Sequence, residues 1–190
     1  MRKLMITLTI AASLFFAGDK ATEASSVHTV QSGDTLWLLG NKYGVSVLDL
    51  KNANSKTGDT IFVGEQLIIP NSITQYEKRL LAQLVTAEAK GEPYAGQVAV
   101  ATVILNRVDS EQFPNTIHDV IHETRQFTPV TTGSINQTAT ASAIKAVDEA
   151  LAFRGQGSGS LFFYNPAIAT NHWIATRDHT ITIGNHVFAK

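Results

Sequence analysis

The chain of 190 residues contains no cysteine. This absence excludes a thiol-nucleophile peptidase, a thiolate metal site, a disulfide framework and attachment to lipid through a cysteine. Charge is scarce as well: Asp, Glu, Lys and Arg make up 16% of the residues, and the formal net charge is −1. No overall electrostatic attraction therefore favours nucleic acid or an anionic membrane surface as a partner.

Several catalytic and ligand-binding motifs are also missing. The sequence has no HExxH or HxH pattern, no G-x-S-x-G elbow and no glycine-rich phosphate loop. His118 and His122 are spaced i, i+4 and would share a helix face, but the next histidines lie in a different part of the chain. We therefore expect no metal centre and no cofactor, and the sequence identifies no protein partner.

Residues 1–24 have the composition of a secretory signal. Arg2 and Lys3 form a basic start, and residues 4–17 form an apolar run that is too short to span a bilayer comfortably. A cleavage site is expected after Ala24. The interpretation favoured is an exported protein with no membrane contact after cleavage. The alternative is an uncleaved N-terminal anchor.

Residues 27–70 have the pattern of a self-contained β-α-α-β unit. Polar turn residues precede the first helix, and Gly44 ends it. The expected elements are a strand at 27–30, helices at 36–43 and 47–54, and a closing strand at 66–69.

This unit resembles a LysM module over nearly its whole length, through VHTVQSGDTLW, Tyr43-Gly44-Val45, LKNAN and IFVGEQLIIP. LysM modules bind N-acetylglucosamine-containing chains of peptidoglycan or chitin, so the resemblance implies a glycan-binding module. It also implies a shallow groove between the loop at 33–36 and the loop at 52–62. The candidate glycan-binding residues are Gly33, Asp34, Thr35, Asn52 and Ile61. A module with a degenerate groove is the alternative.

A short linker, residues 71–75, precedes a larger domain at 76–190. This domain is expected to be mainly helical with a small β element at its end, which makes the fold class α+β. The expected elements are helices at 76–90, 97–108 and 138–154, a loop-rich stretch at 110–134, an extended segment at 161–165 and a β-hairpin at 180–188.

Glu88 is the most informative residue of the larger domain. At 100° per residue it lies near the midline of an apolar helical stripe formed by Leu80, Leu81, Leu84 and Val85. The opposite, water-facing side is expected to hold Arg79, Gln83, Thr86 and Lys90. A carboxylate on a core-facing stripe is costly unless it is paired or faces a cleft, and desolvation would raise its pKa into the range of a general acid. A structural Glu paired with Arg107 is the alternative.

Amide and aromatic side chains are dense in the loop-rich half of this domain. Such residues bind sugars by stacking and by hydrogen bonds to hydroxyl and acetamido groups. Phe162 and Phe163 are expected to be core residues. The candidate substrate-binding residues, with Glu92 added as the nearest second carboxylate, are Glu92, Asn106, Gln126, Phe127, Tyr164, Asn165 and Trp173.

The larger domain resembles the SleB/CwlJ-type cell wall hydrolases, the spore cortex-lytic enzymes of endospore-forming bacteria. The segments that carry this resemblance are AEAKGEPYAGQVAVATVILNRV, FPNTIHDVI, RQFTPV, FFYNP, WI and TITIGNHVF. The resemblance implies a lysozyme-like α+β catalytic domain that acts on peptidoglycan glycan strands, with the first Glu of AEAKGE, Glu88, as catalytic acid. The setting that it implies is the cell wall or the spore cortex or coat, and cortex lysis in germination and wall turnover elsewhere stay open as alternatives. The family members with which we compare it carry a different N-terminal domain or none, so the LysM module is a departure.

No second carboxylate is an obvious partner for Glu88, because Glu92 precedes Pro93 and should leave the helix. A lone acid suits a lytic transglycosylase that cleaves between N-acetylmuramic acid and N-acetylglucosamine. Two alternatives stay open. One is a hydrolytic muramidase or glucosaminidase that uses Glu92 or an Asp to activate water. The other is a non-catalytic wall-binding protein anchored by LysM.

Overall fold

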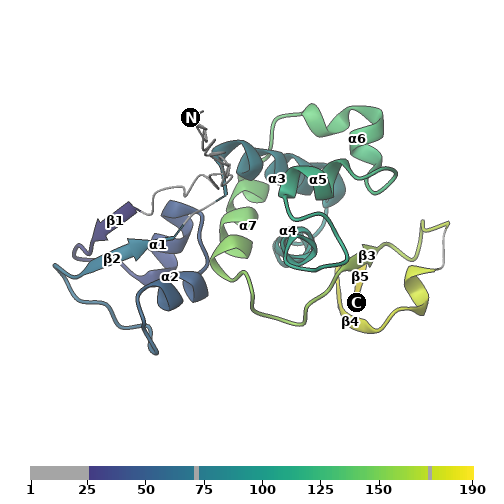
Figure 1. Cartoon of the computed structure of the whole chain (residues 1–190). Helices are drawn as coiled ribbons and strands as arrows, with labels where there is room; N and C mark the ends of the chain where they lie inside the picture. The colour runs from purple at the N-terminus through teal and green to yellow at the C-terminus, as the bar shows by residue number, and fades with distance from the viewer. Residues whose placement is uncertain (1–25, 71–72, 171–172) are drawn as a thin grey trace, which may run out of the picture.

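The computed structural model describes residues 26–70, 73–170 and 173–190. They form two bodies, a small N-terminal one and a larger C-terminal one (Figure 1). The predicted secretory signal at 1–24 lies outside the described residues. Within the described part of the chain, no helix combines the length and the apolarity that crossing a membrane requires.

The small body has the predicted β-α-α-β order. The side chain of Thr35 accepts a hydrogen bond from the backbone N of Leu38 and caps the first helix, and Ser46 caps the second helix in the same way. Gly44 ends the first helix with a φ of 68°, where a residue with a Cβ would be strained. The elements are β1 (Ser26–Thr29), α1 (Leu36–Tyr43), α2 (Val47–Ala53) and β2 (Gln66–Ile69), with β1 antiparallel to β2.

The small body has its own hydrophobic core, separate from that of the larger body. Alternate residues of β2 point inward, so Leu67 and Ile69 are buried while Gln66 and Ile68 are exposed. The core consists of Val30, Leu36, Leu39, Val45, Leu50, Leu67 and Ile69. This separate core explains how so short a segment folds as a unit beside the larger domain.

The larger body is a helical bundle with a three-stranded sheet at its C-terminal end (Figure 1). Helix α4 runs through its centre and packs against α3, α5 and α7. The helices are α3 (Gln75–Glu88), α4 (Tyr94–Val108), α5 (Ile117–His122), α6 (Thr128–Thr132) and α7 (Ala141–Ala152), with 3-10 turns at Ser134–Asn136 and Ile174–Thr176. The strands are β3 (Phe162–Tyr164), β4 (His179–Ile183) and β5 (His186–Ala189), in the order β3-β5-β4. The predicted α+β class is confirmed.

Three details differ from the sequence predictions. The stretch at 110–134 was expected to be loop-rich but contains α5 and α6, helices too short for their periodicity to stand out. Helix α4 begins at Tyr94, directly after Pro93 at its N-cap. Thr86 was expected on the wet face but is buried: its hydroxyl donates to Ala82 O at 2.8 Å and accepts from the backbone N of Thr140 at 3.0 Å.

The two bodies touch through α1 and α7. Gly40 of α1 faces Ala152 of α7, and a Cβ built at Gly40 would lie 3.6 Å from the Ala152 Cβ. The same Cβ would lie only 2.8 Å from the carbonyl O of Val45, so the turn that brings Val45 back onto α1 requires glycine at position 40. A second contact brings Leu48 of α2 to Gly155, just beyond α7.

The β4–β5 hairpin is tied to the turn between α3 and α4 by Glu92. The two carboxylate oxygens of Glu92 accept hydrogen bonds from the backbone N and the side-chain Nδ2 of Asn185, each 2.9 Å long. Burial alone would raise the pKa of Glu92, but the hydrogen bonds from Asn185 and the charge of His186 lower it overall. Gly184 next to it has a φ of +60°, and a Cβ there would collide with Glu92 and Pro93.

The substitution Glu92→Gln should destabilise the fold, because Gln offers one acceptor and one donor to the two donors of Asn185. We expect a loss of about 1–2 kcal/mol in the free energy of unfolding at pH 7. Because the folded-state pKa is lowered, the wild-type advantage is present above pH 4.5 and disappears as the pH falls through the folded-state value. Urea unfolding of both proteins between pH 3 and pH 7 measures this. A difference that stays constant with pH would contradict it, and Glu111→Gln at an exposed site is the control.

Candidate active site

Glu88 is the last residue of α3, and its carboxyl group has no partner in the part of the chain that the structure describes. The residues before it, Leu84 and Val85, are fully buried, whereas Glu88 itself is half-buried. Among the described residues no hydrogen bond or ion pair reaches its carboxylate, and burial raises its pKa. The alternative role, a structural Glu88 paired with Arg107, finds no such pair among the described residues. A carboxyl group without a partner at the edge of the core is suited to hold a proton near neutral pH and to deliver it to a ligand.

The Glu88 carboxyl opens into a cavity of about 460 Å³. Three regions line it: the ends of α3 and α4, the segment between α4 and α6, and the segment from β3 to the second 3-10 turn. The lining residues are Glu88, Arg107, Gln112, Phe113, Arg125, Gln126, Phe127, Phe162, Phe163, Trp173 and Ile174. Within this set Glu88 is the one carboxylate, so no second acid of the set can share in the chemistry of this cavity.

Arg107 joins the walls of the cavity. Its side chain is buried, and its Nε donates to the carbonyl O of Leu161 at 2.7 Å while Nη1 donates to Gln126 Oε1 at 3.2 Å. Burial lowers the pKa of Arg107 to about 10, partly offset by the charge of Glu123, so the guanidinium stays positive at neutral pH. Arg107 thereby connects α4 to β3 and fixes the amide of Gln126.

Aromatic rings surround the Arg107 guanidinium. Its Cζ lies 4.9 Å from the ring centre of Phe113, 5.4 Å from Phe127 and 5.7 Å from Phe162. Such cation–π contacts offset part of the cost of burying the charge. At the exposed edge, Trp173 meets Phe162 edge-on at 5.3 Å, and the Arg177 guanidinium lies 4.0 Å from the Trp173 ring centre.

The structure brings together only part of the predicted site. Glu88, Gln126, Phe127 and Trp173 line the cavity. Four other candidates do not line it, and the side chains of three of the four form hydrogen bonds with other groups. These are Glu92, bonded to Asn185; Asn106, which donates to Ser160 O at 2.9 Å; Asn165, which accepts from the backbone N of Ala167 at 3.0 Å; and Tyr164 in β3.

Sequence reasoning missed Arg107, Arg125 and Gln112 as parts of this cavity, and it assigned Phe162 and Phe163 to the core. Phe163 does pack against the core from a half-buried position, but both rings also line the cavity. Arg107 carried a signal: an arginine near the end of an otherwise apolar helix is buried only with partners.

In the small N-terminal body, two candidate residues have structural roles. The Asp34 carboxylate accepts from the backbone N of Gln31 and contacts His28 Nε2, each at 2.8 Å, and Thr35 caps α1. Asn52 is exposed and Ile61 packs against the small core. Next to Ile61, Phe62 is 69% exposed and Val63 is 72% exposed, which leaves apolar surface beside the predicted groove.

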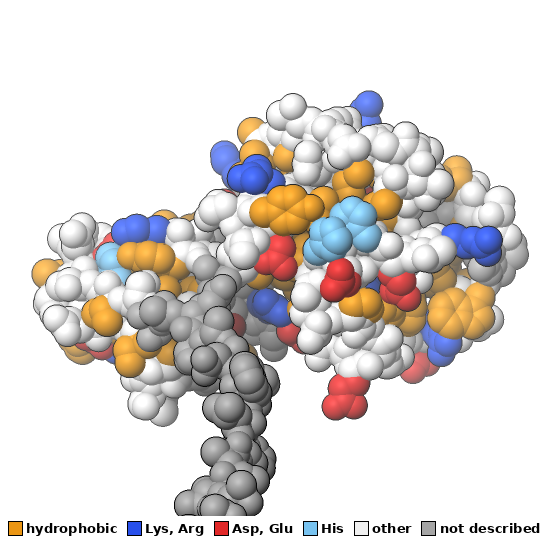
Figure 2. Space-filling model, turned by 45° about the horizontal axis from the view of Figure 1, so that its top comes forward, with side chains coloured by type: hydrophobic (Ala, Val, Ile, Leu, Met, Phe, Trp, Pro, Cys, Tyr) orange, Lys and Arg blue, Asp and Glu red, His pale blue; other side chains and the backbone are white. Residues whose placement is uncertain are grey.

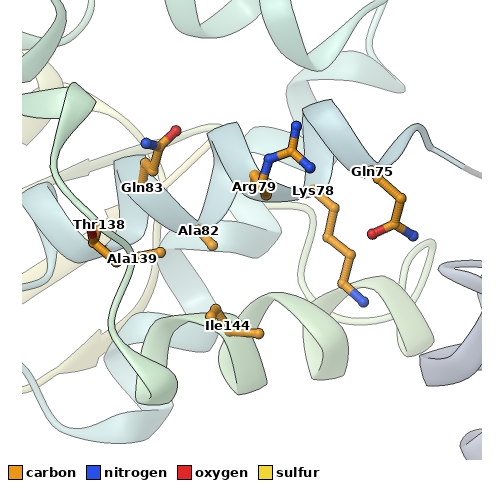
Figure 3. Close-up of a pocket in the computed structure, with 8 residues that line it drawn as sticks. All are labelled: Gln75, Lys78, Arg79, Ala82, Gln83, Thr138, Ala139 and Ile144. Carbon is orange, nitrogen blue, oxygen red and sulfur yellow. The ribbon is translucent and has the colours of Figure 1, made fainter.

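A second cavity of about 460 Å³ lies between the N-terminal half of α3 and the segment that leads into α7 (Figure 3). Its lining contains no carboxyl group, and Lys78 at its edge forms an ion pair with Asp148. The other lining residues are Gln75, Arg79, Ala82, Gln83, Thr138, Ala139 and Ile144. The described lining of this cavity has no group that can act as a general acid near neutral pH, so the cavity at Glu88 is the stronger candidate for an active site.

Comparison with known families agrees with the division of the chain into a small N-terminal body and a larger C-terminal body. The family described as Cell Wall Hydrolase matches residues 91–189, just over half of the chain, and the LysM domain family matches residues 28–70. The chain therefore belongs to the cell wall hydrolase family, and both resemblances inferred from the sequence are confirmed. Glu88 precedes the matched range, so the family match does not include it.

Individual relatives match a large part of the chain. A spore cortex-lytic enzyme of Bacillus cereus is 47% identical over 122 residues, which are 64% of this chain and 47% of that protein. The chain thus spans about half the length of the curated relatives it matches.

Two solved structures match as well. One is the catalytic domain of the germination-specific lytic transglycosylase SleB from Bacillus anthracis, with 46% identity, a TM-score of 0.59, and coverage of 64% of this chain and 100% of that one. The other is the catalytic domain of Bacillus cereus SleB, with 48% identity, a TM-score of 0.58, and coverage of 64% and 94%.

Glu88→Gln should stabilise the fold at neutral pH. Because the folded-state pKa of Glu88 is raised, the folded protein binds more protons than the unfolded chain above pH 4.5, so wild-type stability falls as the pH rises through that window. The variant, which has no charge to bury, should unfold at a higher temperature than wild type at pH 7 and at a similar temperature at pH 4. Thermal unfolding across this range measures the effect. A variant less stable than wild type at pH 7 would indicate a structural Glu88.

Proposed function

We propose that this protein is a lytic transglycosylase that cleaves peptidoglycan glycan strands between N-acetylmuramic acid and N-acetylglucosamine. The observation that carries the proposal is Glu88, the single carboxyl group among the described residues of the cavity, which has no partner among them and a raised pKa. Hydrolysis by the two-carboxylate route needs a second acid about 5–10 Å away. Among the described residues that line the cavity there is none.

In the first step, the protonated Glu88 donates its proton to the glycosidic oxygen. The bond from that oxygen to C1 of the muramoyl residue breaks, and the N-acetylglucosamine side leaves with its new hydroxyl. Positive charge develops at C1 and the ring oxygen, and the substrate's own N-acetyl group assists. A raised pKa serves this step because it keeps the acid protonated near the working pH.

In the second step, the ionised Glu88 accepts the proton of the muramoyl C6 hydroxyl. The C6 oxygen then bonds to C1 and closes a 1,6-anhydro ring. No water is consumed, and Glu88 returns to its protonated state. One residue is thus acid and then base, which is why a lone carboxyl group is sufficient.

Gln126 and the aromatic residues are suited to hold the sugar. Because Gln126 Oε1 is occupied by Arg107, its Nε2 is left to donate to a hydroxyl or acetamido oxygen of the substrate. Trp173 and Phe162, which meet edge-on, line the cavity and add aromatic surface that can contact sugar rings. In this arrangement Arg107 is a positioning residue.

The LysM body is proposed to hold the enzyme on its substrate. A LysM domain implies affinity for N-acetylglucosamine-containing chains, and its contact with α7 links that affinity to the catalytic body. The relatives named as spore cortex-lytic enzymes favour spore cortex of an endospore-forming bacterium as the substrate, reached after export.

Glu88→Gln should abolish glycan cleavage while leaving the protein folded. We expect a fall in rate of at least about a thousandfold, since the variant can neither donate nor accept the proton. Purified spore cortex and vegetative peptidoglycan are digested by both proteins, and the products are identified by mass spectrometry. Wild type should release anhydro-muropeptides that the variant does not release.

Glu111→Gln, at an exposed glutamate outside the cavity, is the matched control and should retain wild-type activity. Products with reducing ends would instead support the hydrolase alternative. Intact glycan with retained wall binding in wild type would indicate a wall-binding protein without catalysis.

Phe62→Ala should weaken binding of the full chain to insoluble peptidoglycan by about tenfold, the effect of losing one aromatic contact with a sugar. Val27→Ala is the matched control, since Val27 is 61% exposed on β1 and Phe62 is 69% exposed beside the predicted groove. Binding is measured by co-sedimentation in the Glu88→Gln background, so that the polymer is not degraded. Equal retention of both variants would place the glycan elsewhere on the module.

A further inference from the structure

Two histidines form an exposed pair on α5. His118 and His122 are one turn apart, and their rings are stacked with centres 4.2 Å apart and planes inclined by 21°. Figure 2 shows histidine side chains gathered on the open surface of the larger body. Neither residue lines the cavity of Glu88, so the proposed glycan chemistry leaves this pair unexplained.

Each of the two rings has its Nδ1 in a hydrogen bond, an arrangement that also occurs in metal-binding histidines. His122 Nδ1 donates to the carbonyl O of His118 at 2.8 Å, and His118 Nδ1 contacts the Asp119 carboxylate at 3.0 Å. A ligating histidine donates its second ring nitrogen to a carbonyl or a carboxylate, which fixes the tautomer and turns the other nitrogen's lone pair outward. In both residues this other nitrogen is Nε2, and no hydrogen bond within the described part of the chain engages it.

The helix that carries the pair is held in place. Ile117, Val120 and Ile121 of α5 are buried, and α5 packs against α3 and α4. The Thr116 side chain caps the helix by accepting from the backbone N of Asp119 at 3.0 Å. A fixed helical turn keeps the two imidazoles adjacent, and rotation of the rings out of their stack brings both Nε2 lone pairs onto one ion.

We propose that His118 and His122 bind a divalent transition metal such as Zn²⁺ or Ni²⁺ through their Nε2 atoms. Imidazole suits these ions, whereas Ca²⁺ and Mg²⁺ require oxygen ligands. Within the described residues no third histidine, aspartate or glutamate completes a cluster. The ion therefore keeps positions for water or for a donor from another molecule. This is a surface site separate from Glu88, and it takes no part in proton transfer.

The test is calorimetric titration of the full chain, made without a polyhistidine tag and freed of metal, with ZnCl₂ and with NiCl₂. We expect saturable binding of one ion per chain and a rise in unfolding temperature with metal, because the ion binds the folded form. His118→Ala and His122→Ala should each weaken the affinity at least about tenfold. His179→Ala is the matched control: that exposed histidine in β4 engages Thr182 through its Nε2.

CaCl₂ and MgCl₂ should give no saturable binding at this site. The Glu88→Gln variant should bind Zn²⁺ as wild type does, which separates this proposal from the catalytic one. No saturable binding of either transition metal, or affinities unchanged in both His118→Ala and His122→Ala, would overturn the assignment.

Discussion

The structure depends on one constraint: a carboxyl group without a hydrogen-bonding partner at the boundary between the core and a cavity. Burial disfavours the charged form of Glu88, and among the described residues no cation or donor compensates. Other interactions of α3 offset the cost of burying the Glu88 charge. A capping box at Thr74 and Glu77 stabilises the start of α3, and the helix packs against α4 and α7. The same burial that lowers stability at neutral pH raises the pKa of Glu88, and a raised pKa is what a proton donor for glycan cleavage requires.

The cavity around Glu88 is assembled from distant segments, and Arg107 connects them. From the buried α4 it reaches Leu161 before β3 and Gln126 before α6, and three phenylalanine rings surround its charge. Glu92 makes a comparable connection by holding the β4–β5 turn against the α3–α4 turn. Two charged residues near the active site thus stabilise its shape, which leaves Glu88 as the acid that faces the proposed substrate.

Sequence patterns predicted the longer elements and the position of Glu88, because helical periodicity and capping are local properties. They failed where the outcome depends on tertiary contacts. Thr86 looked polar and exposed, but its hydroxyl is buried between Ala82 and Thr140. Asn106 and Asn165 are of types that bind sugars, yet their side chains bond to nearby backbone. The presence of Phe162 in the cavity depends on how β3 pairs with β5, which no local pattern encodes.

The central claim is that Glu88 works without a second carboxylate because the substrate supplies the nucleophile. Digestion of peptidoglycan in water enriched in ¹⁸O tests this most directly, with the mass of each newly formed glycan terminus as the readout. The account predicts anhydro termini that carry no ¹⁸O, since the C6 hydroxyl of the sugar attacks C1. Reducing termini that carry ¹⁸O from the first turnovers would contradict it and would require a residue that activates water.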